Sequence, residues 1–202
     1  MSSLLFYTSS EEAIVATDTL VAEQNGNTLG HSSKAIALPH LRLIIAATGA
    51  AALFNRWIGL VNEQSVAFDV DTLDTHAPLN LQMLWGEMQG QFPSPHHYTA
   101  TLYHFGFSHN SGLIHAFAYR SESNFASERL RYGLGIKPDL ENRGGIDFAA
   151  FPAVAPEIMR AQIKQEDLKA SPKGVRIGGQ VQITHLAPDG FSIYSMGSIS
   201  SE

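Results

Sequence analysis

The chain has 202 residues, of which 44% are hydrophobic and 16% charged, and this balance suits one folded domain over residues 1–202 rather than a disordered segment. Its formal net charge of −6 argues against nucleic acid as a partner, because phosphate binding needs clustered Lys and Arg. The absence of cysteine excludes disulfides, thiolate metal sites and a cysteine nucleophile.

In chain order, the first elements predicted are four strands. Residues 4–8 and 13–17 flank a short polar turn, and residues 34–38 and 41–47 flank a second turn. Apolar and β-branched residues dominate these runs, as is typical of strands. We expect the four to form two hairpins within one antiparallel sheet.

Two helices are predicted after the turn at Gly49. Apolar residues of the first share one helical face: Leu53, Trp57, Leu60 and Val61. A second helix is predicted over residues 79–88, with Pro78 at its start. The first helix is apolar over more than a one-sided stripe, so we expect the chain to form a homo-oligomer through these two helices.

The second half of the chain continues with strands at residues 98–107, 113–120 and 130–135, a helix at 156–169, and a final hairpin of 180–186 with 191–196. No repeat and no linker interrupts this order. Runs of strands followed by helices favour layered α+β packing over a parallel βαβ sheet.

No segment of the sequence reads as a membrane span or as a secretory signal. The longest apolar run, residues 43–54, is interrupted by Thr48 and Gly49 and is shorter than the roughly 20 residues that a bilayer requires. Residues 1–5 contain no basic segment. We therefore expect a cytoplasmic protein with no membrane partner.

Three segments of the N-terminal quarter carry a chemically meaningful pattern: Ala16-Thr17-Asp18-Thr19, Ser33-Lys34-Ala35-Ile36-Ala37-Leu38 and Leu43-Ile44-Ile45-Ala46-Ala47-Thr48-Gly49. The interval from Ser2 to Asp18 equals that from Asp18 to Lys34. With these intervals and strand contexts, the region resembles the proteasome β-subunit family and its bacterial relatives.

This resemblance implies an α+β fold, a four-layer αββα sandwich of two antiparallel sheets as in the N-terminal-nucleophile (Ntn) hydrolases. It also implies an amidohydrolase or peptidase that acts on a peptide or amide substrate and needs no cofactor. Ser2 would be the nucleophile after removal of Met1. Asp18, Lys34 and Gly49 would complete the catalytic set.

General chemistry gives each of these residues a role. A hydroxyl is a weak nucleophile, and the free α-amine of Ser2 could act as its base. A nearby Lys34 ammonium would favour the neutral form of that amine, and Asp18 would pair with Lys34. The Gly49 N–H could donate to the oxyanion of the acyl intermediate.

Each residue also has an ordinary structural interpretation. Ser2 suits the position after an initiator Met, Asp18 could cap a turn, and Lys34 or Gly49 could mark a strand end. Two further hypotheses therefore stand beside the enzyme. One is a catalytically inactive proteasome-like scaffold or binding protein, and the other is an unrelated α+β binding protein with a coincidental motif.

The nine histidines match no metal-binding spacing, so we expect no metal site. His104 is interpreted as a packed or surface side chain of a strand. Three acidic residues that precede the second predicted helix, Asp69, Asp71 and Asp74, are interpreted as part of a solvated loop.

Overall fold

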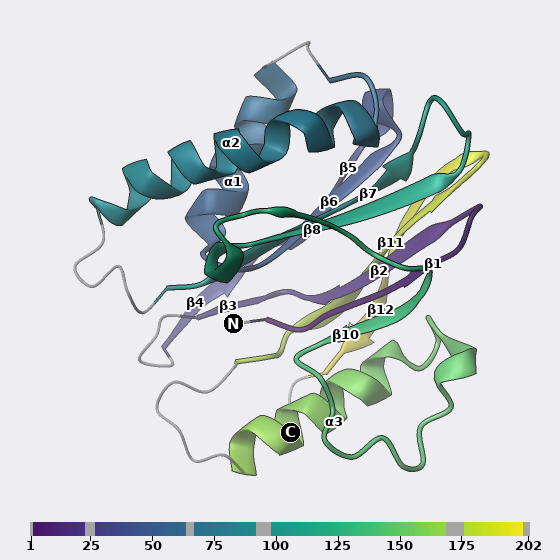
Figure 1. Cartoon of the computed structure of the whole chain (residues 1–202). Coiled ribbons are helices and arrows are strands. Elements are labelled where there is room, and N and C mark those ends of the chain that lie inside the picture. Colours follow the sequence, from purple (N-terminus) through teal and green to yellow (C-terminus); the bar gives the residue numbers. More distant parts are fainter. Residues whose placement is uncertain (1, 23–26, 64–66, 92–97, 169–175, 200–202) are drawn as a thin grey trace.

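The computed structural model describes residues 2–22, 27–63, 67–91, 98–168 and 176–199, and two five-stranded antiparallel sheets form its centre (Figure 1). The first sheet has the order β10 (Gly133–Lys137), β1 (Leu4–Thr8), β2 (Ala13–Asp18), β11 (Gln180–Ala187) and β12 (Gly190–Ser198). The second has the order β5 (Ala35–Leu38), β6 (Leu43–Gly49), β7 (Ala100–Phe107), β8 (Ile114–Arg120) and β9 (Ser127–Arg129).

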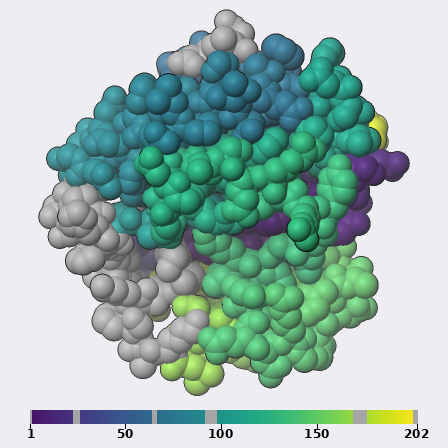
Figure 2. Space-filling view, in the orientation of Figure 1, coloured from purple at the N-terminus to yellow at the C-terminus, as the bar shows by residue number. Residues whose placement is uncertain are grey.

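Helices cover the outer face of each sheet. The helices α1 (Ala51–Glu63) and α2 (Val70–Gln89) pack on the second sheet, and α3 (Ala155–Leu168) packs on the first (Figure 1). In the space-filling view these two helical layers occupy opposite sides of the molecule (Figure 2). The chain therefore has the predicted α+β fold, with the layers in the order helix, sheet, sheet, helix. No described helix is long and apolar enough to cross a membrane.

The core consists of three layers of buried apolar side chains. One lies between the two sheets and includes Val15 and Phe105, one lies under α1 and α2 and includes Trp57, and one lies under α3 and includes Ile158. Strand β7 is buried along its whole length because both of its faces are covered. Both sheets are thus held between apolar layers, which explains why their strands are so rich in apolar residues.

The predicted strands exist, but their assignment to one sheet was wrong. Strands β1 and β2 pair in the first sheet, whereas β5 and β6 pair in the second. A short hairpin of β3 (Leu20–Ala22) and β4 (Thr28–His31) connects β2 to β5 and carries the chain from one sheet to the other. The sequence predicted no strand in this connection, so the change of sheet was missed.

The second helix begins earlier than predicted. Helix α2 starts at Val70, and Pro78 lies inside it rather than at its start. The Asp69 side chain accepts the Thr72 N–H at 2.8 Å and so caps the helix. Asp71 in the first turn adds a favourable interaction with the helix dipole. These N-terminal signals, together with the buried face of the helix, outweigh the single N–H that Pro78 lacks.

Most of the apolar surface of α1 is buried within the chain itself, by the second sheet and by α2. Helix α2, in contrast, exposes Leu79 and Met83, whose exposed fractions are 65% and 54%. The prediction of self-association through α1 rested on the wide apolar surface of that helix, and most of this surface is covered within the chain. Self-association stays a prediction, and of the two helices on the second sheet α2 is the one with large exposed apolar side chains.

Three short 3₁₀ turns complete the described secondary structure: Pro39–Leu41 between β5 and β6, Ser121–Ser123 after β8, and Phe148–Ala150 before α3. The first of them holds Leu41, which had been predicted as a strand residue.

Candidate functional site

One end of the sandwich holds a buried ion pair. Asp18 is the last residue of β2 in the first sheet, and Lys34 directly precedes β5 in the second sheet. The Lys34 Nζ lies 2.8 Å from Asp18 Oδ1. Asp18 is fully buried, and Lys34 is 8% exposed. The predicted contact between these two residues thus exists, and it connects the two sheets at what we call the Asp18 end of the sandwich.

Backbone donors complete the environment of the Asp18 carboxylate. The Ser3 N–H donates to Oδ1 at 2.8 Å, and the Gly178 N–H donates to Oδ2 at 3.1 Å. Burial raises the pKa of Asp18 and lowers the pKa of Lys34, and the contact between the two charges opposes both changes. Each of the three hydrogen bonds favours the ionised carboxylate, so together with the ion pair they offset part of the cost of burying it.

Ser2 lies beside this pair. The Ser3 hydroxyl donates to Gln162 Oε1 on α3 at 2.6 Å, and Leu4 is buried between the two sheets. Side chains alternate along extended chain, so Ser2 falls on the same inward face as Leu4. Ser2 is half-buried, and within the described residues no hydrogen bond joins its hydroxyl to Lys34. The predicted contact between Ser2 and Lys34 therefore stays a prediction, and Met1 lies outside the described residues.

Gly49 ends β6 at the same end of the sandwich. Its φ of +94° is a conformation that favours glycine, and a Cβ there would lie 2.0 Å from the Thr99 carbonyl oxygen. Two residues earlier, the Ala47 N–H donates to the Lys34 carbonyl at 3.0 Å. Alternation along the strand directs the Gly49 N–H to the same side, beyond the first residue of β5. The Gly49 N–H thus lies beyond the residues of β6 that pair with β5.

A second lysine at this end was not found from the sequence. Lys137 ends β10 directly opposite Leu4 of β1, and its Nζ donates to Thr101 Oγ1 of the second sheet at 2.6 Å. Burial lowers the pKa of Lys137. No local motif marks this residue, because its position depends on the pairing of β10 with β1.

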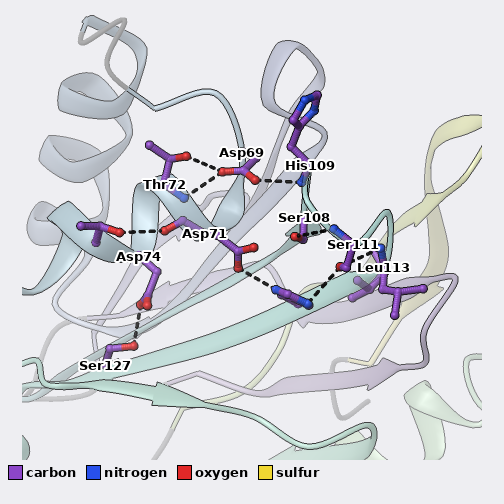
Figure 3. A network of polar contacts seen from close by, with 12 residues as sticks. Asp69, Asp71, Thr72, Asp74, Ser108, His109, Ser111, Leu113 and Ser127 are labelled. Atoms are coloured by element: carbon purple, nitrogen blue, oxygen red, sulfur yellow. Dashed lines mark hydrogen bonds and ion pairs between the residues drawn. The ribbon is translucent and has the colours of Figure 1, made fainter.

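The acidic residues before Pro78 are not a solvated loop, which corrects the sequence interpretation. Asp69 caps α2, and its Oδ2 also accepts the His109 N–H at 2.8 Å (Figure 3). Asp71 lies 2.6 Å from His115 Nδ1, and Asp74 accepts the Tyr119 hydroxyl at 2.6 Å. These carboxylates connect the first turns of α2 to the second sheet.

His104 is a packed core residue, one of the two outcomes predicted for it. It is fully buried in β7, and its Nε2 accepts the Trp57 Nε1–H at 2.9 Å. Burial lowers the pKa of His104 to about 3, so the ring is neutral. Within the described residues, no three His, Asp or Glu side chains gather as a metal site would require. His96 and His97 lie outside the described residues.

Comparisons with known proteins place this arrangement among known folds. The sequence matches no protein-family model and no curated protein. The two facing sheets between helices have the proteasome-like fold, as solved structures show. Anbu (ancestral β-subunit) from Yersinia bercovieri is similar with a TM-score of 0.63 and 14% identity over 98% of this chain and 87% of that one. An Anbu (Gly-1) mutant from Hyphomicrobium sp. strain MC1 also has a TM-score of 0.63, with 12% identity over 100% and 89% of the two chains.

Proposed function

We propose that this chain is an Ntn amidohydrolase or peptidase that cleaves amide bonds with Ser2 after removal of Met1. One observation carries the proposal: Lys34 Nζ and the Ser3 N–H donate to the same oxygen of Asp18. The Lys34 ammonium therefore lies within two hydrogen-bond lengths of the peptide unit that joins Ser2 to Ser3. A buried cation beside the N-terminal residue is what an α-amine base requires.

The proposed reaction has two steps. The Ser2 hydroxyl attacks the amide carbonyl and gives its proton to its own α-amine, which passes that proton to the leaving amine as the C–N bond breaks. Water then cleaves the resulting ester by the same route. The Lys34 charge disfavours a protonated α-amine, so the base is available near neutral pH.

Gly49 is the proposed donor to the oxyanion in both steps. Its N–H points beyond the start of β5, towards the side on which Lys34 lies. Among the described residues, no strand on that side accepts a hydrogen bond from it. A backbone N–H held in this way needs no reorganisation when negative charge develops. The same fixed geometry explains why a residue without a Cβ ends β6.

Intact mass and peptide cleavage test the proposal together. The native protein should lack Met1 and should release fluorophore from part of a panel of fluorogenic peptides. Ser2→Ala should abolish that release, whereas Ser123→Ala, a change at an exposed serine far along the chain, should not. Retention of Met1 in the natural host, or no cleavage of any peptide, would instead support the scaffold or binding hypothesis. Cleavage that survives Ser2→Ala would exclude Ser2 as the nucleophile.

We also propose that the chain self-associates through α2, because Leu79 and Met83 are exposed on its outer surface. Light scattering at micromolar concentration should give a mass well above the 22.0 kDa of one chain. The variant Leu79→Glu/Met83→Glu should lower that mass, and a wild-type monomer would contradict the assembly without affecting the catalytic proposal.

A further inference from the structure

A second group of side chains, far in sequence from Ser2, has the geometry of a nucleophile, a base and an orienting carboxylate. Ser111 Oγ lies 3.3 Å from Nε2 of His115, and Nδ1 of the same ring lies 2.6 Å from Asp71 Oδ1 (Figure 3). The three residues come from the turn between β7 and β8, from β8, and from the first turn of α2. Hydrogen-bond reach between nucleophile, base and orienting group is the signature of an activated serine.

The direction of each hydrogen bond suits proton transfer from serine to histidine. An ionised Asp71 only accepts hydrogen bonds, so Nδ1 of a neutral His115 carries the ring proton and Nε2 presents its lone pair. The Leu113 N–H donates to Ser111 Oγ at 3.2 Å. The hydroxyl proton is therefore free to point at Nε2, and the Leu113 N–H favours the charged form of the oxygen.

Surrounding contacts hold this arrangement in place. The His115 side chain is 11% exposed and that of Asp71 is 28% exposed, so the base and its partner are largely enclosed. The Ser111 N–H donates to Ser108 Oγ at 3.3 Å, which fixes the turn that carries the nucleophile. Asp69 joins the start of α2 to this turn through the His109 N–H. The three reacting groups are thus positioned before any substrate arrives.

The nucleophile itself is accessible and has apolar neighbours. Ser111 is exposed, and Leu113, two residues further along the chain, is 43% exposed. Phe68, which is 66% exposed, packs edge-on against His109 of the same turn. An open site with apolar side chains suits a small apolar acyl group with a good leaving group, and it does not enclose a long chain.

We propose that Ser111, His115 and Asp71 form a second hydrolytic site, independent of Ser2, that accepts activated esters with short apolar acyl groups. Ser111 Oγ forms a bond to the carbonyl carbon of the ester while the hydroxyl proton moves to His115 Nε2. The bond from that carbon to the leaving phenol oxygen breaks, and the phenol takes the proton. Water, deprotonated by the same nitrogen, then releases the carboxylic acid and regenerates Ser111.

A fluorophosphonate probe and p-nitrophenyl butyrate test this site in the Ser2→Ala background, where the proposed N-terminal nucleophile is absent. Mass spectrometry should find the probe on the peptide that contains Ser111. Ser111→Ala and His115→Gln should each lower the rate of p-nitrophenol release by at least about 100-fold, the lower end of what a positioned general base contributes. Ser127→Ala is the matched control, because it removes a serine bonded to Asp74 in the same network without contact to His115.

Folding and site assignment are checked in the same experiment. Ser111 is exposed, so Ser111→Ala should keep the wild-type melting temperature even if His115→Gln does not. An unlabelled Ser111, or an unchanged rate in a folded Ser111→Ala variant, would overturn the second site. Labelling of Ser2 alone in the wild-type protein would also overturn it while supporting the first proposal.

Discussion

Two carboxylates of this protein each bind a nitrogen-bearing side chain across two elements, but their surroundings differ. The Asp18 side chain is fully enclosed between the sheets beside Lys34, whereas the Asp71 side chain, which contacts His115, is 28% exposed at the start of α2. Removing one partner of a buried pair leaves an uncompensated charge, while a surface pair returns to water at little cost. Substitutions at the first pair therefore disturb stability and function together, and those at the second pair can separate them.

The largest effect is expected at the buried pair. Lys34→Met should lower the free energy of unfolding by about 3–5 kcal/mol, because the Asp18 carboxylate remains buried with only its two backbone donors. Urea denaturation at pH 7 measures this loss. The double variant Asp18→Asn/Lys34→Met removes both charges and should recover part of it. A loss below about 1 kcal/mol in the single variant would mean that water reaches the pair, and the comparison would fail.

His104 shows the effect of burial without ion pairing, because it is buried and has no carboxylate partner among the described residues. The pKa of His104 in the folded chain, about 3, lies below the 6.5 usual for histidine, so the unfolded chain binds the proton more readily. Stability should therefore be full above about pH 6.5 and fall as pH decreases through the window between the two values. The loss between pH 7 and pH 5 should be about 2 kcal/mol.

Urea denaturation at several pH values checks the histidine prediction. The control is His104→Gln, which keeps an acceptor for Trp57 but does not titrate. Its stability should depend less on pH between 5 and 7 than that of the wild type. Equal slopes for the two proteins would show that other groups cause the acid sensitivity.

These residues also show what the sequence could predict. Asp18 and Lys34 were found because their intervals and strand contexts resemble those of the proteasome β-subunit family, and such strands are visible in local patterns. Lys137 and the Ser111–His115–Asp71 group were missed, because strand register and helix docking bring them together over long sequence distances. The sheet assignment failed for the same reason: nothing local in the polar connection after β2 reports that the next strand joins another sheet.

The start of α2 was a different kind of error, because its signal was present in the sequence. Asp69 followed by an acidic first turn is typical of a helix N-terminus. Pro78 was given more weight, since proline often occupies the first helical position. Side-chain capping and a buried apolar face together outweighed that statistical preference here.

An intermediate effect on stability is expected at Asp69, which is buried and joins the start of α2 to the turn between β7 and β8. Asp69→Ala removes the cap of α2 and the acceptor of the His109 N–H, so unfolding should become easier by about 1–2 kcal/mol. Asp69→Asn is the matched variant, because its amide oxygen can still cap the helix, and it should retain most of the stability. Equal losses in the two variants would show that charge matters here more than capping does.

The smallest effect on stability is expected at Asp71, and this makes it the sharpest test of the comparison. Asp71→Asn should change the free energy of unfolding by less than about 1 kcal/mol, because the carboxylate is partly exposed and its pair with His115 is near the surface. An amide can also donate to His115 Nδ1 and so favour the ring tautomer whose Nε2–H points at Ser111, which leaves the serine without a base. The rate of p-nitrophenyl butyrate hydrolysis should therefore fall by at least 10-fold while the urea midpoint hardly moves. A large loss of stability with an unchanged rate would reverse the roles of the two pairs, and it would leave Asp71 as a purely structural contact between α2 and β8.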